Sequence, residues 1–136
     1  MNGLVLDTSA LLAYASGESI EPGAMIALAG EDPGQQVWVP ALCLGEAAHR
    51  LLGAKQGAVL DVLTGSGSDT RIAVLDGPTA RRVARIAAEQ AVTLDAAHAI
   101  ATALLYRCYL VTGDAEVAAT AGRLGVETLD LTETWD

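Results

Sequence analysis

The sequence predicts an α/β fold in which a mainly parallel sheet of about four to five strands carries helices on both faces. Short apolar runs recur along the chain, and segments of helical character separate each run from the next. This alternation favours parallel strands joined by helical crossovers. The length of 136 residues fits one domain, and no repeat, linker or low-complexity segment divides it. We therefore expect a single domain over residues 1–136.

Each expected element has a local cause in the sequence. Strands are expected at the short, mostly apolar runs 4–6, 37–39, 72–75, 109–111 and 126–129. Helices are expected between or after these runs, at 8–15, 23–29, 40–52, 56–63, 78–90, 95–107 and 115–124. Pro40 and Pro78 are placed as the first residues of their helices, and Gly53 ends one of them.

Composition limits the class of protein. Half of the residues are hydrophobic, but aromatic residues make up only 4% and Phe is absent, so the core must consist of small and aliphatic side chains. Cys43 and Cys108 both lie in apolar runs, which favours free buried thiols in a reducing compartment. No secretory signal is visible, and no segment reaches the ~18 apolar residues of a membrane span. We expect a cytoplasmic protein without a membrane segment.

Four acidic residues occupy comparable places in this scheme. Asp7 and Asp114 follow predicted strands, Asp95 opens a helix, and Glu46 lies inside the helix after the second strand. Because parallel strands end at one edge of a sheet, where α/β proteins bind ligands, we expect the four side chains to line one cleft. Clustered carboxylates repel each other, and a hard divalent cation relieves the repulsion. Oxygen ligands favour Mg²⁺ or Mn²⁺ over zinc.

Each acid also has a purely structural interpretation. Asp7, Asp95 and Asp114 are placed as helix N-caps, a common position for aspartate. Glu46 precedes Arg50 by four residues, which is the spacing of a surface ion pair on a helix. For one acid alone these interpretations are favoured. The complete set, carried by helices that are apolar over most of their surface, favours a shared site.

The ordered set of acidic segments resembles the PIN-domain family. The segments are Asp7-Thr8-Ser9 after a strand, Leu44-Gly45-Glu46-Ala47-Ala48, Asp95-Ala96-Ala97-His98-Ala99 at the start of a helix, and Val111-Thr112-Gly113-Asp114. The resemblance covers essentially the whole chain, and its size and element order are similar to the toxin ribonucleases of the VapC type. It implies a three-layer α/β/α sandwich. It also implies an RNA substrate, a small cognate antitoxin that holds the toxin inactive, and a homodimer.

The resemblance further implies a catalytic, metal-binding site. Its ligands for one or two Mg²⁺ or Mn²⁺ ions are Asp7, Glu46, Asp95 and Asp114. Metal-assisted hydrolysis of a phosphodiester fits such a site, since bound metal lowers the pKa of water and no protein nucleophile is needed. Thr8, Ser9 and Thr112 are then expected to position the carboxylates or bound waters. No organic cofactor is expected.

Two nearby side chains each leave two interpretations open. Glu116 stands where many family members carry an aspartate, and it either reaches a second metal ion or only interacts with the helix dipole. His98 follows Asp95 by one helical turn, and it either contacts Asp95 or the substrate, or is a core residue. The structural interpretation is favoured for both.

The charge of the chain is unusual for an RNA-binding protein. The net charge is −9, and two divalent ions at the acids would still leave it negative. The candidates for phosphate contacts are Arg50, Lys55, Arg71, Arg81, Arg82, Arg85, Arg107 and Arg123. Weak general affinity for RNA suits an enzyme that selects one structured RNA, or a protein whose main partner is another protein.

Other function classes fit less well. A P-loop NTPase is excluded because the chain has no glycine-rich loop with Lys-Ser or Lys-Thr. A receiver domain needs a lysine near the last strands, whereas Lys55 lies in mid-chain, and an aspartyl phosphatase needs a second aspartate where Ser9 stands. Two alternatives stay open: a PIN nuclease of ordinary RNA processing, and a non-catalytic PIN-like binding module.

Overall fold

The computed structural model describes residues 2–17, 21–32 and 34–131, and the remaining residues of the expected domain lie outside that description. Within it, five parallel strands form one sheet in the order β3-β2-β1-β4-β5. The strands are β1 (Gly3–Leu6), β2 (Gln36–Pro40), β3 (Arg71–Ala73), β4 (Tyr109–Thr112) and β5 (Thr128–Asp130). The predicted fold class, α/β with a parallel central sheet, is confirmed.

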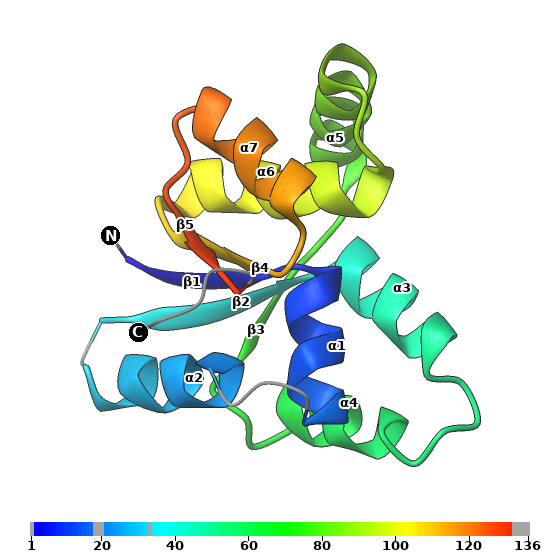
Figure 1. Ribbon diagram of the computed structural model, residues 1–136, viewed down its shortest axis with the longest axis vertical. Helices are drawn as coiled ribbons and strands as arrows, with labels where there is room; N and C mark the ends of the chain where they lie inside the picture. Colours follow the sequence, from blue (N-terminus) through cyan, green and yellow to red (C-terminus); the bar gives the residue numbers. More distant parts are fainter. Residues whose placement is uncertain (1, 18–20, 33, 132–136) are drawn as a thin grey trace.

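Helices cover both faces of this sheet, which gives the three layers seen in Figure 1. The described helices are α1 (Thr8–Ser16), α2 (Glu21–Glu31), α3 (Ala41–Arg50), α4 (Gly57–Thr64), α5 (Gly77–Gln90), α6 (Leu94–Tyr106) and α7 (Ala115–Arg123). In Figure 1, α5, α6 and α7 lie above the sheet, and α1, α2 and α4 lie below it. None of these helices is long and apolar enough to cross a membrane.

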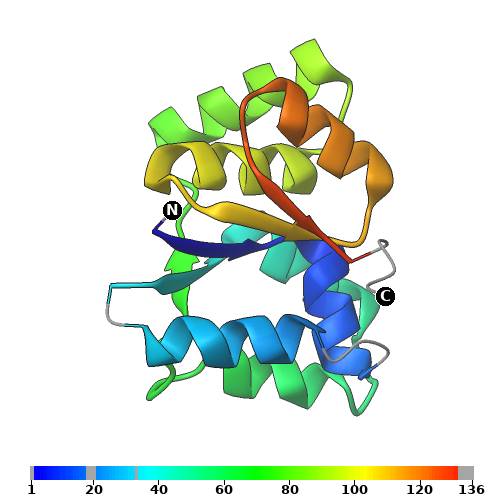
Figure 2. The same ribbon diagram turned by 60° about the vertical axis from the view of Figure 1, so that its left-hand side comes forward.

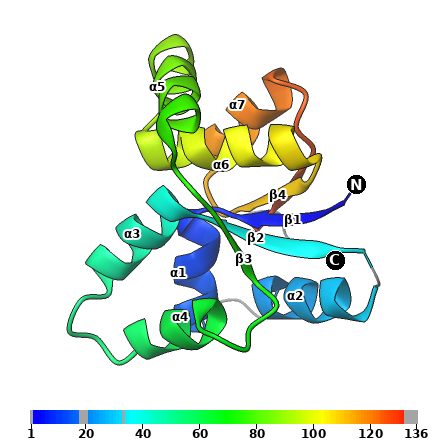
Figure 3. The same ribbon diagram turned by 180° about the vertical axis from the view of Figure 1, so that it is seen from behind.

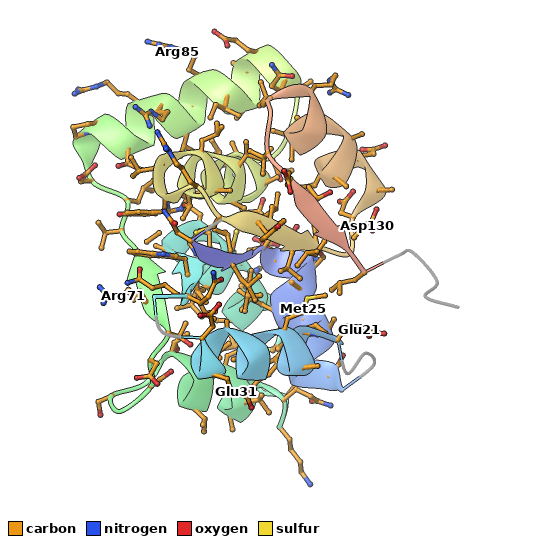
Figure 4. The ribbon with its side chains drawn as sticks, turned by 90° about the vertical axis from the view of Figure 1, so that its left-hand side faces the viewer. Glu21, Met25, Glu31, Arg71, Arg85 and Asp130 are labelled. Carbon is orange, nitrogen blue, oxygen red and sulfur yellow. The ribbon has the colours of Figure 1, made fainter. Side chains whose placement is uncertain are left out.

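The core is built from small and aliphatic side chains, as the composition predicts. All four residues of β1 are buried, and α6 is buried along one continuous stretch, 96–103. Alanines on this stretch let α6 approach the sheet closely, and Figure 2 shows α6 lying across β1 and β4. On the opposite face Met25 of α2 packs against the core, and Figure 4 shows its side chain between α2 and the sheet.

Gly3 permits the close approach of β2 to the central strand. It opens β1 in register with Gln36, and its φ of +152° is rare for residues with a side chain. A Cβ atom at this position would lie 1.9 Å from the Gln36 carbonyl oxygen. Glycine is therefore required where the first strand begins.

Pro40 differs from its predicted role. It is the last residue of β2 and pairs with Ala73, and its φ of −64° and ψ of 137° are extended. It therefore occupies the N-cap of α3 and is not the first helical residue. The helix ends at Arg50, so Gly53 lies beyond it and does not end it.

Other predicted limits are wrong by one or two residues. The helix expected at 23–29 is longer at both ends, because Pro22 is compatible with a first helical turn. The strand expected at 72–75 ends at Ala73, and the apolar residues that follow are exposed. Apolar character alone misplaces this end, since Val74 has 66% of its surface exposed. The positions of helix and strand ends depend on contacts that a local pattern does not contain.

The carboxyl ends of the strands converge on one edge of the sheet. Helix α1 begins after β1, α3 after β2, and α7 after β4. Figure 3 shows the beginnings of α1, α3 and α6 close together at this edge, and α3 packs against both α1 and α6. The loops and first turns at this edge are the part of the fold that positions the acids.

Candidate metal and phosphodiester site

The predicted acids line one cleft at the carboxyl edge of the sheet. The cleft has a volume of about 610 Å³. Its lining residues are Asp7, Thr8, Ser9, Leu42, Glu46, Arg50, Thr93, Leu94, Asp95, Ala96, Asp114 and Val117. The structure thus brings together four carboxylates from four separate parts of the chain.

Asp7 forms the buried end of the cleft. It follows β1, has 3% of its surface exposed, and occupies the N-cap of α1. Its Oδ1 accepts hydrogen bonds from Ser9 Oγ at 2.6 Å and from the Ala10 N–H at 2.9 Å. Burial raises the pKa of Asp7 above its usual range, although the bonds from Ser9, Thr112 and Ala10 oppose this and the Asp114 charge adds to it. Asp7 is therefore both a helix cap and a wall of the cleft.

Asp95 lies in the first turn of α6 and also lines the cleft. Thr93, which has extended backbone angles, takes the N-cap, so the predicted capping position of Asp95 is wrong. Asp95 Oδ2 accepts a hydrogen bond of 2.6 Å from Thr8 Oγ1. Burial raises the pKa of this carboxyl, but hydrogen bonds from Thr8, Thr93 and the Ala96 backbone outweigh it, and the pKa is lowered overall.

Glu46 is paired inside the cleft with a basic residue of its own helix. Arg50 Nε donates to Glu46 Oε1 at 3.0 Å, which confirms the predicted i,i+4 pair. The two side chains are 56% and 39% exposed, for Arg50 and Glu46 respectively. Glu46 therefore has both its structural partner and a place in the cleft.

Asp114 caps α7 at the end of β4. Its Oδ1 accepts hydrogen bonds from the backbone N–H of Glu116 at 2.9 Å and of Val117 at 3.3 Å. This confirms the predicted capping role while the side chain also lines the cleft. The Glu116 side chain is exposed in the first turn of α7, which agrees with the helix-dipole interpretation.

Ser9 links the end of β1 to the end of β4. Its hydroxyl donates to Asp7 and accepts from the Gly113 N–H at 2.7 Å. Thr112 Oγ1 lies 3.3 Å from the same hydroxyl and accepts from the Asp114 N–H at 3.1 Å. These bonds connect the Asp7 carboxylate to the turn that carries Asp114.

His98 and Cys43 lie behind the cleft and belong to the core. His98 is 1% exposed, its Nδ1 accepts a hydrogen bond from the Leu42 N–H at 3.3 Å, and burial lowers the pKa of its imidazole. His98 is thus buried in the core, as predicted, but its Nε2 has no hydrogen-bond partner among the described residues. Cys43 is a free buried thiol that donates to the Asp95 carbonyl oxygen at 3.2 Å, and burial raises its pKa. Cys108 is also free and buried, as predicted.

The cleft fits a hydrated hard cation better than a fully enclosed one. In the described part of the chain, no three His, Cys, Asp or Glu side chains are grouped closely enough to enclose a metal ion. Mg²⁺ usually keeps several waters and binds through one or two carboxylates, so an open wall of acids suits it. The charged ligands available in the cleft are carboxylate oxygens, which favour a hard ion.

Comparison with known proteins identifies the family. The sequence profile of the PIN domain matches residues 4–123. The chain belongs to the PIN-domain family. No relative with significant similarity was found among curated proteins.

This PIN domain is similar in fold to several solved structures. One is a toxin–antitoxin complex from Klebsiella pneumoniae, with 24% identity, coverage of 95% of this chain and 100% of that chain, and a TM-score of 0.69. Another is VapC20 of Mycobacterium tuberculosis, described as a sarcin-ricin loop cleaving toxin, with 16% identity, coverage of 86% and 94%, and a TM-score of 0.67. A third is VapBC-1 of nontypeable Haemophilus influenzae, with 13% identity, coverage of 96% and 98%, and a TM-score of 0.65.

Sequence reasoning did not single out every residue of the cleft of this PIN domain. Arg50 is predicted as the i,i+4 partner of Glu46 and as one of eight candidates for phosphate contacts, but not as a residue of the cleft. Thr93 contributes a hydrogen bond to Asp95, and the N-cap preference of threonine is the signal for it. The apolar walls, Leu42 and Val117, have no local signal that separates them from core residues.

Proposed function

We propose that this PIN domain is a metal-dependent endoribonuclease that hydrolyses RNA phosphodiester bonds. The observation that carries the proposal is the convergence of Asp7, Glu46, Asp95 and Asp114 on one cleft. Carboxylates held together in this way repel each other, and burial, with a smaller contribution from the Asp114 charge, raises the pKa of Asp7. A cation-binding role accounts for this arrangement, and the PIN-domain profile supports it.

The residues have the following proposed roles. Asp7, Glu46 and Asp95 are the principal carboxylate ligands, and Asp114 binds directly or through water. A bound Mg²⁺ or Mn²⁺ supplies Lewis acidity and lowers the pKa of water. Thr8 orients the Asp95 carboxylate through its 2.6 Å hydrogen bond.

Ser9 and Thr112 support the other side of the proposed site. Ser9 holds the Asp7 carboxylate in place through the 2.6 Å bond to its Oδ1. Thr112 holds the backbone of Asp114 through the 3.1 Å bond to its N–H. The apolar walls Leu42 and Val117 limit the water that reaches the carboxylates.

The proposed biological setting is a toxin–antitoxin pair. The similar structures from Klebsiella pneumoniae and Haemophilus influenzae are a toxin–antitoxin complex and VapBC-1, and VapC20 is a toxin that cleaves the sarcin-ricin loop. We infer a small cognate antitoxin as partner, an RNA substrate, and a homodimer as the assembly. Growth arrest on expression of this chain separates a toxin from a nuclease of ordinary RNA processing.

A non-catalytic binding module is the second candidate. The Glu46–Arg50 ion pair and the lack of a closed metal cage among the described residues favour it. The acids argue against it, because a helix cap explains Asp7 alone but not why four carboxylates line one cleft. Metal binding therefore separates the two candidates.

The test is cleavage of a total RNA pool by the purified protein, with the cut sites mapped. We expect cleavage with Mg²⁺ or Mn²⁺ and none with excess EDTA. Asp95→Asn keeps an acceptor for Thr8 but loses the charge, and it should lower the rate by about 100-fold or more. Glu89→Gln, an exposed acid on α5, is the matched control and should leave the rate unchanged. Equal cleavage in EDTA, or an active Asp95→Asn protein, contradicts the proposal.

A further inference from the structure

Arg50 is the only lysine or arginine among the described residues that line the acid cleft. Its Nε donates to Glu46 Oε1 at 3.0 Å, and its side chain is 56% exposed. We propose that Arg50 binds a phosphate of the RNA substrate and that Glu46 holds the guanidinium at the cleft until RNA enters. This inference rests on the proposed nuclease function and names a residue that binds its substrate.

The hydrogen bonding of Arg50 leaves it able to bind phosphate. Only Nε is engaged by Glu46, and the guanidinium contacts no other partner among the residues described. Both terminal amino groups thus remain available as donors. A guanidinium presents two parallel N–H groups to a phosphate, a geometry that lysine does not offer.

The Glu46–Arg50 pair is easily opened. Both side chains are partly exposed and lie on one helix at the i,i+4 spacing. An exposed pair of this kind shifts an equilibrium by only about two-fold. An RNA phosphate, or a cation that binds Glu46, therefore displaces the contact at little cost.

The charge distribution makes Arg50 the natural phosphate contact. Four carboxylates and one guanidinium leave the cleft with an excess of negative charge, within a chain of net charge −9. Other basic residues lie elsewhere: Arg71 is the first residue of β3, at the amino edge of the sheet, and Arg85 is exposed on α5 (Figure 4). Attraction of RNA into the cleft by protein charge thus depends on Arg50.

A purely structural Arg50 predicts a different result from a phosphate-binding one. If Arg50 only stabilised α3, its removal would loosen the cleft and weaken the binding of both RNA and metal ions. If it binds phosphate while it competes with cations for Glu46, its removal weakens RNA binding and strengthens cation binding. The opposite signs of the two changes are the signature of the proposed role.

The first measurement is fluorescence anisotropy of a labelled single-stranded RNA pool at low salt in EDTA. We expect Arg50→Ala to weaken RNA binding about three- to ten-fold. A loss of this size lies between the contribution of an exposed ion pair and that of a charge-assisted hydrogen bond. The slope of log affinity against log salt should fall by about 0.7, the value for one phosphate contact on a single strand. The RNA affinity of Arg50→Lys should lie between those of the wild type and Arg50→Ala, because lysine keeps the charge but lacks the two parallel N–H groups of a guanidinium.

Arg85→Ala removes the same charge outside the cleft and is the matched control. It should change the RNA affinity by less than about two-fold. Equal weakening by Arg85→Ala and Arg50→Ala, or no measurable RNA binding by the wild type at low salt, overturns the proposal.

The second measurement is calorimetric titration with Mn²⁺. Arg50→Ala should bind Mn²⁺ about two-fold more tightly or better, since Glu46 no longer has a competing cation. Weaker Mn²⁺ binding by Arg50→Ala indicates a structural role and overturns the proposal. If the wild type binds no Mn²⁺, the proposed metal nuclease fails, while the anisotropy measurement still decides whether Arg50 binds RNA.

Discussion

Asp7 and Asp95 line the same cleft, yet their pKa values are shifted in opposite directions. Burial dominates at Asp7 and raises its pKa. At Asp95, hydrogen bonds from Thr8 and its neighbours exceed the effect of burial and lower the pKa. Asp95 therefore remains charged to lower pH, whereas Asp7 is the carboxylate that most needs a cation.

Thr8→Val is expected to raise the pH below which metal binding is lost, which we call the acid limit of binding. The Thr8 hydroxyl donates a 2.6 Å bond to Asp95 Oδ2, and this bond favours the ionised form. Its loss raises the Asp95 pKa, so protonation at Asp95 competes with metal at a higher pH than in the wild type. Calorimetric titration with Mn²⁺ at a series of pH values measures the shift.

Thr70→Val is the control for the Thr8 prediction. It makes the same change of side chain, but Thr70 does not line the acid cleft. It should leave the pH dependence unchanged. An unchanged or lower acid limit in Thr8→Val would show that Thr8 does not set the charge of Asp95.

Four helices, together with the residues that cap them, carry most of the cleft. Asp95 lies in the first turn of α6 and Glu46 in the middle of α3, and the other two acids, Asp7 and Asp114, cap α1 and α7. The same group thus stabilises a helix and offers an oxygen to the cleft. Substitutions of different shape separate these two contributions.

Asp114→Ala and Asp114→Asn should differ in stability but not in metal binding. Asparagine still accepts the backbone bonds from Glu116 and Val117, so Asp114→Asn keeps the wild-type free energy of unfolding. Asp114→Ala loses the cap and about 1 kcal/mol of stability. Both variants lose the charge and should bind Mn²⁺ more weakly. Denaturant unfolding and calorimetry measure the two effects, and wild-type Mn²⁺ affinity in Asp114→Asn would remove Asp114 from the site.

Stability of the folded chain should depend on cations and on pH through Asp7. Because burial raises the folded-state pKa of Asp7, its ionisation opposes folding. Stability is lost as pH rises from the ordinary carboxyl pKa through the raised folded-state pKa, so the cost is absent in acid and grows with increasing pH. Asp7→Asn carries no charge, so without metal the free energy of unfolding of this variant should exceed that of the wild type, by an amount that grows as pH rises.

Cation binding should make the wild type more stable than Asp7→Asn, the reverse of the order expected without metal. Mn²⁺ at about one hundred times its dissociation constant stabilises the wild type by roughly 2.7 kcal/mol, whereas Asp7→Asn gains little. Thermal unfolding in EDTA and in Mn²⁺, at acid and neutral pH, tests both statements. An Asp7→Asn protein that is less stable in EDTA and equally stabilised by Mn²⁺ would exclude Asp7 as the central ligand.

Much of the fold was predictable because its causes are local. Apolar runs such as Leu4 to Leu6 and the buried face of α6 indicate their elements directly, and strands joined by helices favour parallel pairing. The end of β3 was not predictable from apolar character, since Val74 is apolar but exposed. Pro40 likewise meets the local rule for a first helical residue, yet its pairing with Ala73 keeps it in β2.

The sequence by itself determined the order of strands and helices and the placement of Asp7 and Asp114 at strand ends, because both follow from patterns a few residues long. Only the tertiary structure decided how the acids behave. A bond that lowers the Asp95 pKa comes from Thr8, 87 residues away, and Asp7 reaches its 3% exposure only in the folded chain. The position of Arg50 in the cleft and of His98 behind it follows from the packing of α3 against α6. Burial and long-range hydrogen bonds arise from contacts between segments that are distant in the sequence. These contacts shift the pKa values of Asp7 and Asp95, and a local sequence pattern does not contain them.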